Sequence, residues 1–358
     1  MYKNNFNLLR LYGAFQVLLQ HSLYYLSNDN SREDNYTFFI GNLMQQFHGV
    51  AIFFLLSGFL IFMSYDKHPN IVDYTINRVL RIYPALYVNI FVSLVILYIF
   101  GYLYFDFEFF SWFIVQITMF QFYNIEMFRG FGVGVINGSL WTISLELSFY
   151  ILLPILVFIY NRNILLIIII FISSFLLWIY DIYSNHSIIY NRLLHISIIP
   201  HLFIFMIGMI YYKYFNTLQR YIKDKFLIWI LLYLLFLCIS NDMNFHKFII
   251  YFIIKWSLFS LVVFSFAFSW RELSYKLLKG NDYTYGIYIY HMLIINIFVT
   301  MGFVGDIKYL IYIILLSILF GILSWYLIEK PFLKLKKHSL FNELKNKKEN
   351  SETVNTKF

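Results

Sequence analysis

The chain has 358 residues, of which 61% are hydrophobic and 13% are charged, and its mean hydropathy is +0.68. A soluble domain carries about twice that charged fraction, so the composition excludes a soluble globular enzyme. Repeated apolar runs of roughly twenty residues predict an all-α, multi-span membrane protein. The formal net charge of +8 does not indicate nucleic-acid binding, because basic residues of a membrane protein sort to the cytoplasmic side.

Apolar runs predict about ten transmembrane helices. In chain order they lie near residues 8–26, 42–65, 82–104, 141–160, 164–181, 197–215, 226–240, 248–269, 283–302 and 308–328. A further apolar stretch, at 109–123, is ambiguous by itself. The charges of the connecting segments decide how it is interpreted.

Three connectors and the C-terminal tail are rich in Lys and Arg: 66–81, 216–225, 270–282 and 330–358. These segments are predicted to face the cytoplasm. The intervening connectors carry more acid than base, which places them outside. Both conditions hold if the segment near 109–140 is re-entrant or interfacial and both termini are cytoplasmic.

We expect one membrane domain over residues 1–335, followed by a basic, mobile cytoplasmic tail at 336–358. The N-terminal sequence MYKNNFN leads into a span that contains Arg and His, and no small-residue cleavage site follows. The first span is therefore expected to be retained and not removed as a signal peptide.

The first span, NLLRLYGAFQVLLQHSLYYL, carries Arg10 and His21 inside its apolar run. An ionisable residue inside a membrane span is energetically expensive, which makes both residues functional candidates. Eleven residues at ~100° each bring the two side chains to the same face, ~16 Å apart along the helix axis. We expect the rest of the chain to be organised around that face.

Arg78 and Arg81 follow the second predicted span, in the sequence NRVLRIYP. Three residues apart, they share a helix face and could clamp phosphate groups bidentately. The simpler interpretation of such a pair is ordinary anchoring of basic residues at the cytoplasmic membrane edge. The residue types alone leave both interpretations open.

The segment 129–150, RGFGVGVINGSLWTISLELSFY, departs most from plain hydrophobic sequence. Non-helical backbone at membrane depth is tolerated only where it is buried or lines a cavity, and the four glycines suit such a segment. Glu146 is predicted at a depth similar to that of His21, where a carboxylate could polarise the imidazole or position an acceptor hydroxyl. A structural contact that orders the helices is the alternative.

Four further residues are candidates for lining a polar cavity: His48, Ser139, Trp141 and His291. Lys255 also sits within a span, where it could line a cavity, snorkel to the membrane surface or pair with a carboxylate. Three other histidines cluster near a predicted outer connector: His186, His195 and His201. They lack zinc-ligand spacing and a carboxylate partner, so surface or packing roles are favoured and no metal site is expected.

In combination, these motifs resemble those of the membrane-bound acyltransferase-3 family, bacterial enzymes that mostly O-acetylate surface glycans such as O-antigen and peptidoglycan. Six elements match in family order over about residues 5–335. They are Arg-x10-His at 10–21, FFxLSGFL at 53–60, Arg-x-x-Arg at 78–81, SLWTxSxExxFY at 139–150, YxxYxxH at 285–291 and EKPF at 329–332.

The resemblance implies that acetyl-CoA, or another acyl-CoA, is the donor and that a sugar hydroxyl is the acceptor. It implies catalytic roles for Arg10, His21 and Glu146 and a donor-binding role for Arg78 and Arg81. His21 could act as a general base or as an acyl-carrying nucleophile. The site would lie in the bacterial cytoplasmic (inner) membrane, in contact with membrane lipid.

Many members of the family carry a C-terminal extracytoplasmic SGNH-type domain that completes the transfer. We expect this chain to be of the stand-alone type, which favours a lipid-linked or nascent glycan over peptidoglycan as the acceptor. Two alternatives remain. A flippase or other transporter of polysaccharide or lipid-linked oligosaccharide would use the intramembrane charges as a substrate path, and an acyltransferase could instead act on a small molecule.

Overall fold

The computed structural model describes residues 4–26, 41, 44–67, 69–183, 193–242, 248–306 and 308–335. Within these ranges the chain forms helices and no strand. The α-helices are α1 (Phe6–Leu26), α3 (Gly49–Lys67), α4 (Ile71–Ile99), α5 (Phe107–Ile117), α6 (Trp141–Arg162), α7 (Ile164–Tyr183), α9 (Leu202–Lys213), α10 (Phe215–Ile222), α11 (Phe226–Asp242), α12 (Ile249–Phe268), α13 (Leu273–Leu278), α14 (Thr284–Thr300) and α15 (Lys308–Ser324). The predicted tail at 336–358 and His186 lie outside the described residues.

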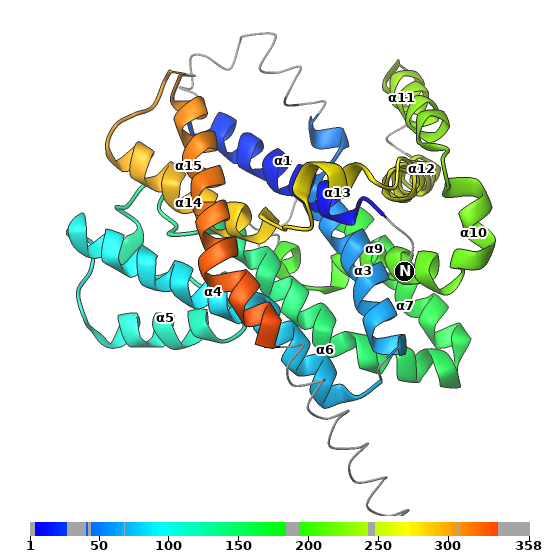
Figure 1. Cartoon of the computed structure of the whole chain (residues 1–358), viewed down its shortest axis with the longest axis horizontal. Helices are drawn as coiled ribbons and strands as arrows, with labels where there is room; N and C mark the ends of the chain where they lie inside the picture. The colour runs from blue at the N-terminus through cyan, green and yellow to red at the C-terminus, as the bar shows by residue number, and fades with distance from the viewer. Residues whose placement is uncertain are drawn as a thin grey trace, which may run out of the picture.

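Short helical turns complete the architecture: the 3-10 turns η2 (Glu126–Phe128), η3 (Gly138–Leu140) and η4 (Ile199–His201), and the π-helical turn η6 (Trp325–Glu329) that continues α15. Figure 1 shows α1, α14 and α15 gathered on one side, with α10 and α11 at one edge and α5 at the opposite edge.

Within the described residues, six helices are long and apolar enough to cross a membrane: 44–67, 71–99, 138–162, 164–183, 249–268 and 308–335. Three shorter apolar helices, 199–213, 226–240 and 284–300, coincide with three other predicted spans. The remaining prediction, 8–26, coincides with α1, which is not among the six. The chain is therefore a multi-pass helical membrane protein, while ten crossings and cytoplasmic termini stay predictions.

The connector predicted at 66–81 is largely helical, because α4 begins at Ile71. The side chain of Asn70 caps this helix by accepting hydrogen bonds from the backbone N–H groups of Val72 and Asp73. Arg78 and Arg81 consequently lie on the second and third turns of α4 and not in a loop. The predicted start of this helix, near residue 82, was wrong because its first turns carry polar and charged residues and resemble a connector in sequence.

The ambiguous stretch at 109–123 contains α5, which has 11 residues and is capped by the side chain of Asp106. A helix of that length spans ~16 Å, about half of the hydrocarbon core of a bilayer. It is too short to cross the membrane, in agreement with a re-entrant or interfacial segment. The side of the membrane on which it lies stays a prediction.

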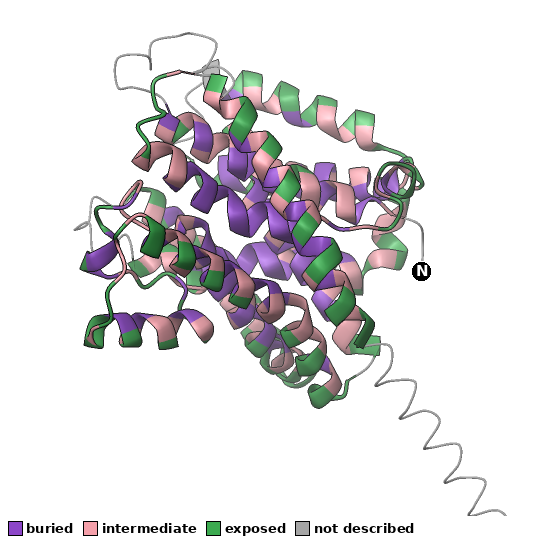
Figure 2. Cartoon of the chain, turned by 60° about the vertical axis from the view of Figure 1, so that its left-hand side comes forward, coloured by how far each residue is buried: buried purple, intermediate pink, exposed green. Residues whose placement is uncertain are grey.

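The central helix is α14, since every residue from Thr284 to Asn296 is buried. Both α1 and α15 pack along it, and α4 and η3 also contact it. Gly286 permits a close approach of α15, because a Cβ atom there would lie 2.8 Å from the Cα atom of Gly321. Figure 2 shows this buried centre surrounded by helices whose outer faces are exposed. The sequence therefore misplaced the organising helix, which is α14 and not α1.

Candidate active site

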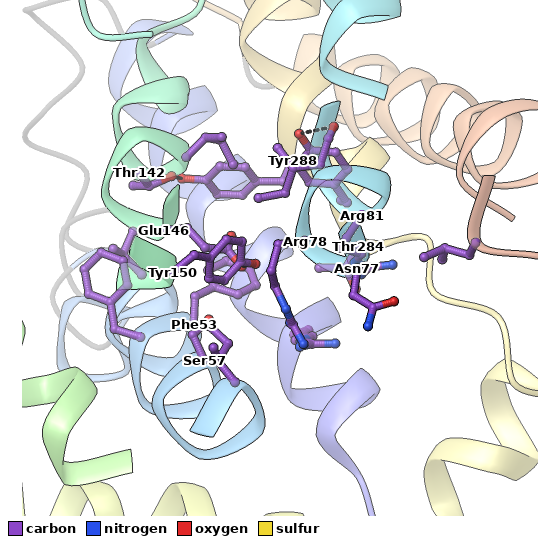
Figure 3. A pocket seen from close by; sticks show the side chains of 18 residues that line it. Phe53, Ser57, Asn77, Arg78, Arg81, Thr142, Glu146, Tyr150, Thr284 and Tyr288 are labelled. Atoms are coloured by element: carbon purple, nitrogen blue, oxygen red, sulfur yellow. Dashed lines mark hydrogen bonds between the residues drawn. The ribbon is translucent and has the colours of Figure 1, made fainter. Parts of the chain in front are cut away.

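A cavity of about 200 Å³ lies among α1, α3, α4, α6 and α14. Its polar lining consists of Arg10, Ser57, Asn77, Arg78, Arg81, Thr142, Glu146, Tyr150, Thr284, Tyr285 and Tyr288. Figure 3 shows these helices contributing side chains to one space, with Arg78, Glu146 and Tyr150 next to one another. The fold thus brings together four of the five residues expected to catalyse the reaction or bind the donor; His21 is not part of this lining.

Two buried carboxylates hold Arg81 in the cavity wall. Its Nη2 lies 2.6 Å from Oδ2 of Asp282, and its Nη1 lies 3.9 Å from Oε2 of Glu329. Arg10 joins the cluster, with Nη1 3.7 Å from the same oxygen of Asp282. Asp282 and Glu329 are 6% and 2% exposed, respectively. The guanidinium of Arg81 is therefore already paired and cannot wrap a phosphate group without leaving a buried carboxylate behind.

Asp282 is ionised in this setting. It lies in the turn between α13 and α14, where burial alone would raise its pKa, but the positive charges of Arg81 and Arg10 hold the pKa below its ordinary value. Its Oδ1 also accepts a 3.3 Å hydrogen bond from the backbone N–H of Thr284 at the start of α14. Sequence reasoning missed Asp282, because it lies in a basic connector 201 residues from Arg81.

Arg78 occupies a different environment from Arg81. Its guanidinium carbon lies 5.6 Å from the centre of the Tyr74 ring and 5.4 Å from the centre of the Tyr150 ring. Its Nε is buried without a hydrogen-bond partner, and no ion pair joins it to any of the described residues. A buried donor without a partner is costly, so Arg78 is the arginine of the cavity that is available to an anionic ligand.

Glu146 accepts a short hydrogen bond from the hydroxyl of Tyr150, one turn further along α6. The expected contact between Glu146 and His21 is not what the structure shows, since Glu146 lies at the arginine end of the cavity. The point at which α6 begins explains this position of Glu146. The turn before it, η3, is buried against α14, so α6 starts inside the protein and carries Glu146 one turn deeper than Thr142.

His21 pairs instead with His291, with its Nδ1 3.0 Å from Nε2 of His291 and the two ring planes within 17° of each other. The Tyr288 ring lies next to that of His291, at 5.7 Å between centres, and also lines the cavity. The hydroxyl of Tyr288 lies 2.7 Å from that of Thr142. Tyr288 therefore lies between the cavity and the pair of histidines. Because Arg10 and His21 both contact the segment 282–291, they share one face of α1, as predicted.

The four residues expected to line a cavity do not line this one. His48 is exposed, and Ser139 donates a 2.7 Å hydrogen bond to Asn137. Trp141 packs against the ring of His195, and His291 is completely buried beside His21. The lining comes from their neighbours in the same motifs, because helical periodicity turns adjacent residues in different directions. The lining neighbours are Thr142, Tyr150, Tyr285 and Tyr288.

Two other expectations concern isolated polar residues. His201 bonds through Nε2 to the carbonyl of His195, at 2.8 Å, which gives these rings a packing role. Within the described part of the chain, no group of three His, Cys, Asp or Glu residues is placed to hold a metal ion. Lys255 lies with Nζ 5.7 Å from the centre of the Tyr251 ring on its own helix.

Asn296 holds the glycine-rich segment, residues 129–138, against the end of α14. The Oδ1 of Asn296 accepts from the backbone N–H of Val133 at 2.9 Å, and its Nδ2 donates to the carbonyls of Val135 and Ile136. Gly132 has φ +55° and lies so close to Asn296 that a Cβ atom there would collide with it. Sequence reasoning anticipated a buried irregular segment but missed Asn296, which looks like one polar residue in an apolar helix.

Comparison with known proteins identifies the family of the chain. Residues 3–329 match the family description "Acyltransferase domain" of the acyltransferase-3 family. The chain belongs to that family. This acyltransferase is 30% identical to "Nodulation protein 10" of Rhizobium leguminosarum bv. viciae over 94% of each chain. It is 29% identical to "O-acetyl transferase" of Shigella phage Sf6, over 93% of its own length and 97% of the relative. No solved structure matches the acyltransferase.

Proposed function

We propose that this acyltransferase moves an acyl group, in the first instance acetyl, from cytoplasmic acyl-CoA to a hydroxyl of a cell-surface polysaccharide or its lipid-linked precursor in the bacterial inner membrane. The observation that carries the proposal is the cavity that has Arg78 at one end, without an ion-pair partner among the described residues, and Tyr288, the neighbour of the His21–His291 pair, at the other. The name of the Shigella phage Sf6 relative, "O-acetyl transferase", supports transfer of an acetyl group to a hydroxyl oxygen.

The arginine end suits the anionic nucleotide portion of the donor. Charge-assisted hydrogen bonds to phosphate are among the stronger polar contacts, and Nε of Arg78 has no hydrogen-bond partner in the described part of the chain. In this proposal Arg10 and Arg81 add positive potential while they stay paired with Asp282. Glu146 and Tyr150 lie beside Arg78 and act on the donor side, not on His21.

The imidazole end suits acyl transfer. As a general base, His21 takes the proton of the acceptor hydroxyl while the hydroxyl oxygen bonds to the thioester carbonyl carbon. The carbon–sulfur bond then breaks, and the leaving CoA thiolate takes that proton to become the free thiol. As a nucleophile, an imidazole nitrogen bonds to the carbonyl carbon first, the carbon–sulfur bond breaks, and CoA leaves as the thiolate. The acceptor hydroxyl oxygen then takes the acyl group from the imidazole, and the hydroxyl proton passes to the thiolate to give free CoA.

The test uses purified protein in nanodiscs, acetyl-CoA labelled in the acetyl group, and extracted surface glycan. We expect free CoA and labelled glycan from the wild type and from the control Lys308→Ala, which changes an exposed side chain at the start of α15. We expect neither from His21→Ala. Turnover on small hydroxyl compounds but not on glycan would move the acceptor to a small molecule, and full activity of His21→Ala would remove His21 from the chemistry.

A further inference from the structure

We propose that His291 is a positioning residue that sets the tautomer of His21, so that Nε2 of His21 is the reactive nitrogen. This inference rests on the proposed function for its chemical meaning, but the hydrogen-bond geometry stands independently. It starts from a contact at the other side of His291, where Nδ1 lies 2.6 Å from the backbone carbonyl oxygen of Tyr288.

The chain of hydrogen bonds has a defined direction. A carbonyl oxygen can only accept, so Nδ1 of His291 carries the proton in that contact. Neutral imidazole has one N–H group, which leaves Nε2 of His291 as an acceptor. Its partner at 3.0 Å, Nδ1 of His21, must then be the donor. Neutral His21 therefore carries its proton on Nδ1 and a free lone pair on Nε2.

Burial separates the roles of the two histidines. His291 is 0% exposed and has both ring nitrogens engaged, whereas His21 is half-buried. His21 therefore keeps some surface that a substrate could contact, whereas His291 has none. His21 is thus the member of the pair that reacts, and His291 acts through it.

The anchor of this arrangement is rigid. The carbonyl of Ile289, next to Tyr288, accepts hydrogen bonds from the side chains of Asn89 on α4, at 2.9 Å, and Asn137, at 2.6 Å. The turn of α14 that presents the Tyr288 carbonyl is therefore fixed from two other segments. Preorganisation of this kind holds a catalytic group in one geometry before the substrate arrives.

Both chemical routes left open for His21 need the same nitrogen. As a base, Nε2 accepts the hydroxyl proton and gives it to the departing CoA sulfur. As a nucleophile, Nε2 bonds to the acyl carbon while the carbon–sulfur bond breaks and CoA leaves as the thiolate; Nε2 is released when the hydroxyl oxygen takes the acyl group and the hydroxyl proton passes to the thiolate. In each route the Nδ1–H of His21 stays bonded to His291. The opposite tautomer would place a hydrogen atom where the reaction needs a lone pair, and a wrong tautomer is strongly inhibitory in hydrolases with an oriented histidine.

The decisive measurement is ¹⁵N NMR of protein labelled at histidine, in nanodiscs and without substrate. The ring signals of His21 are identified by their loss in His21→Ala. We expect a protonated Nδ1 and an unprotonated Nε2 for His21 in the wild type. We expect the same in His291→Gln, whose amide can accept from His21 and donate to the Tyr288 carbonyl. We expect His291→Leu, of similar bulk but without an acceptor, to lose this tautomer.

Kinetics on the same variants test the consequence. His291→Leu should lower kcat by about 10²-fold or more with the KM for acyl-CoA unchanged, while His291→Gln retains most of the activity. Equal losses in both variants would show that His291 only packs. A protonated Nε2 of His21 in the wild type would overturn the proposal even if His291→Leu does not fold. If the wild type shows the expected tautomer but transfers no acyl group, the proposed function fails. The proposal that His291 sets the tautomer of His21 then still stands.

Discussion

The guanidinium of Arg81 on α4 lies 2.6 Å from the carboxylate of Asp282, which precedes α14, although 201 residues separate them in the chain. This ion pair ties the helix that carries the Arg-x-x-Arg motif to the central helix of the fold. As a consequence, the two arginines of the motif have different surroundings. Arg81 is held by carboxylates, whereas Arg78 lies near two tyrosine rings and its Nε has no hydrogen-bond partner among the residues that the structure describes.

Replacing Arg78 should mainly weaken donor binding. Hydrogen bonds to charged groups are worth about 1.5–3 kcal/mol, so Arg78→Ala is expected to raise the KM for acyl-CoA by about tenfold or more and to change kcat less. Arg78→Lys should recover part of this effect, because it keeps the charge but not the planar stacking on Tyr150. Steady-state kinetics with varied acyl-CoA gives the answer, and an unchanged KM would favour simple membrane anchoring.

Replacing Asp282 should destabilise the protein itself. Asp282→Asn leaves Arg10 and Arg81 without their shared counter-charge in a largely buried site, which typically costs about 3–5 kcal/mol. The expected result is a clearly lower unfolding temperature in detergent. The matched control is Asp306→Asn, which breaks an exposed pair with Lys308 and should leave the unfolding temperature unchanged. Equal effects of the two substitutions would contradict the structural role of Asp282.

The same carboxylate predicts a pH dependence of stability. The folded-state pKa of Asp282 lies below its ordinary value, so its contribution to stability is complete above the unfolded pKa of about 3.9. That contribution is lost as the pH falls through the lower, folded pKa. The difference in unfolding temperature between the wild type and Asp282→Asn should therefore be constant at neutral pH and narrow below about pH 4. A difference that grows on acidification would show the opposite sign of linkage.

The glycine-rich segment should be accessible from outside the cell. Arg129 at its start is exposed, so Arg129→Cys in a Cys238→Ser background should react with a membrane-impermeant thiol reagent in intact cells. Lys276→Cys, in the basic and exposed helix α13, should react only after the cells are opened. Labelling with the reverse pattern would invert the predicted orientation of the membrane domain.

Asn296 should keep the glycine-rich segment in one conformation. Asn296→Leu removes the hydrogen bonds to Val133, Val135 and Ile136 and leaves buried backbone groups without partners. We expect faster hydrogen exchange over residues 130–137 and a lower stability, with the amide of Asn296→Gln restoring little because its longer side chain shifts the contacts. Unchanged exchange in Asn296→Leu would mean that the segment is ordered by packing alone.

Helix positions were largely predictable, and helix partners were not. The apolar runs located α6, α7 and α12 because length and hydropathy are local properties. The start of α4 was missed because its first turns are polar, and the capping role of Asn70 is visible only once the helix is present. The partner of Glu146, which is Tyr150 and not His21, could not be predicted because it depends on how η3 packs on α14, which no local pattern records.

The sequence by itself determined that the chain spans a membrane many times and that Arg10 and His21 share a face of α1, since helix geometry fixes the direction of side chains eleven residues apart. The six ordered motifs also determined its family, which the family match over residues 3–329 confirms. Only the tertiary structure decided the partners: Asp282 for Arg81 and His291 for His21, 201 and 270 residues away. Such pairs depend on which helices pack together, and that choice is made by the burial of the whole chain around α14.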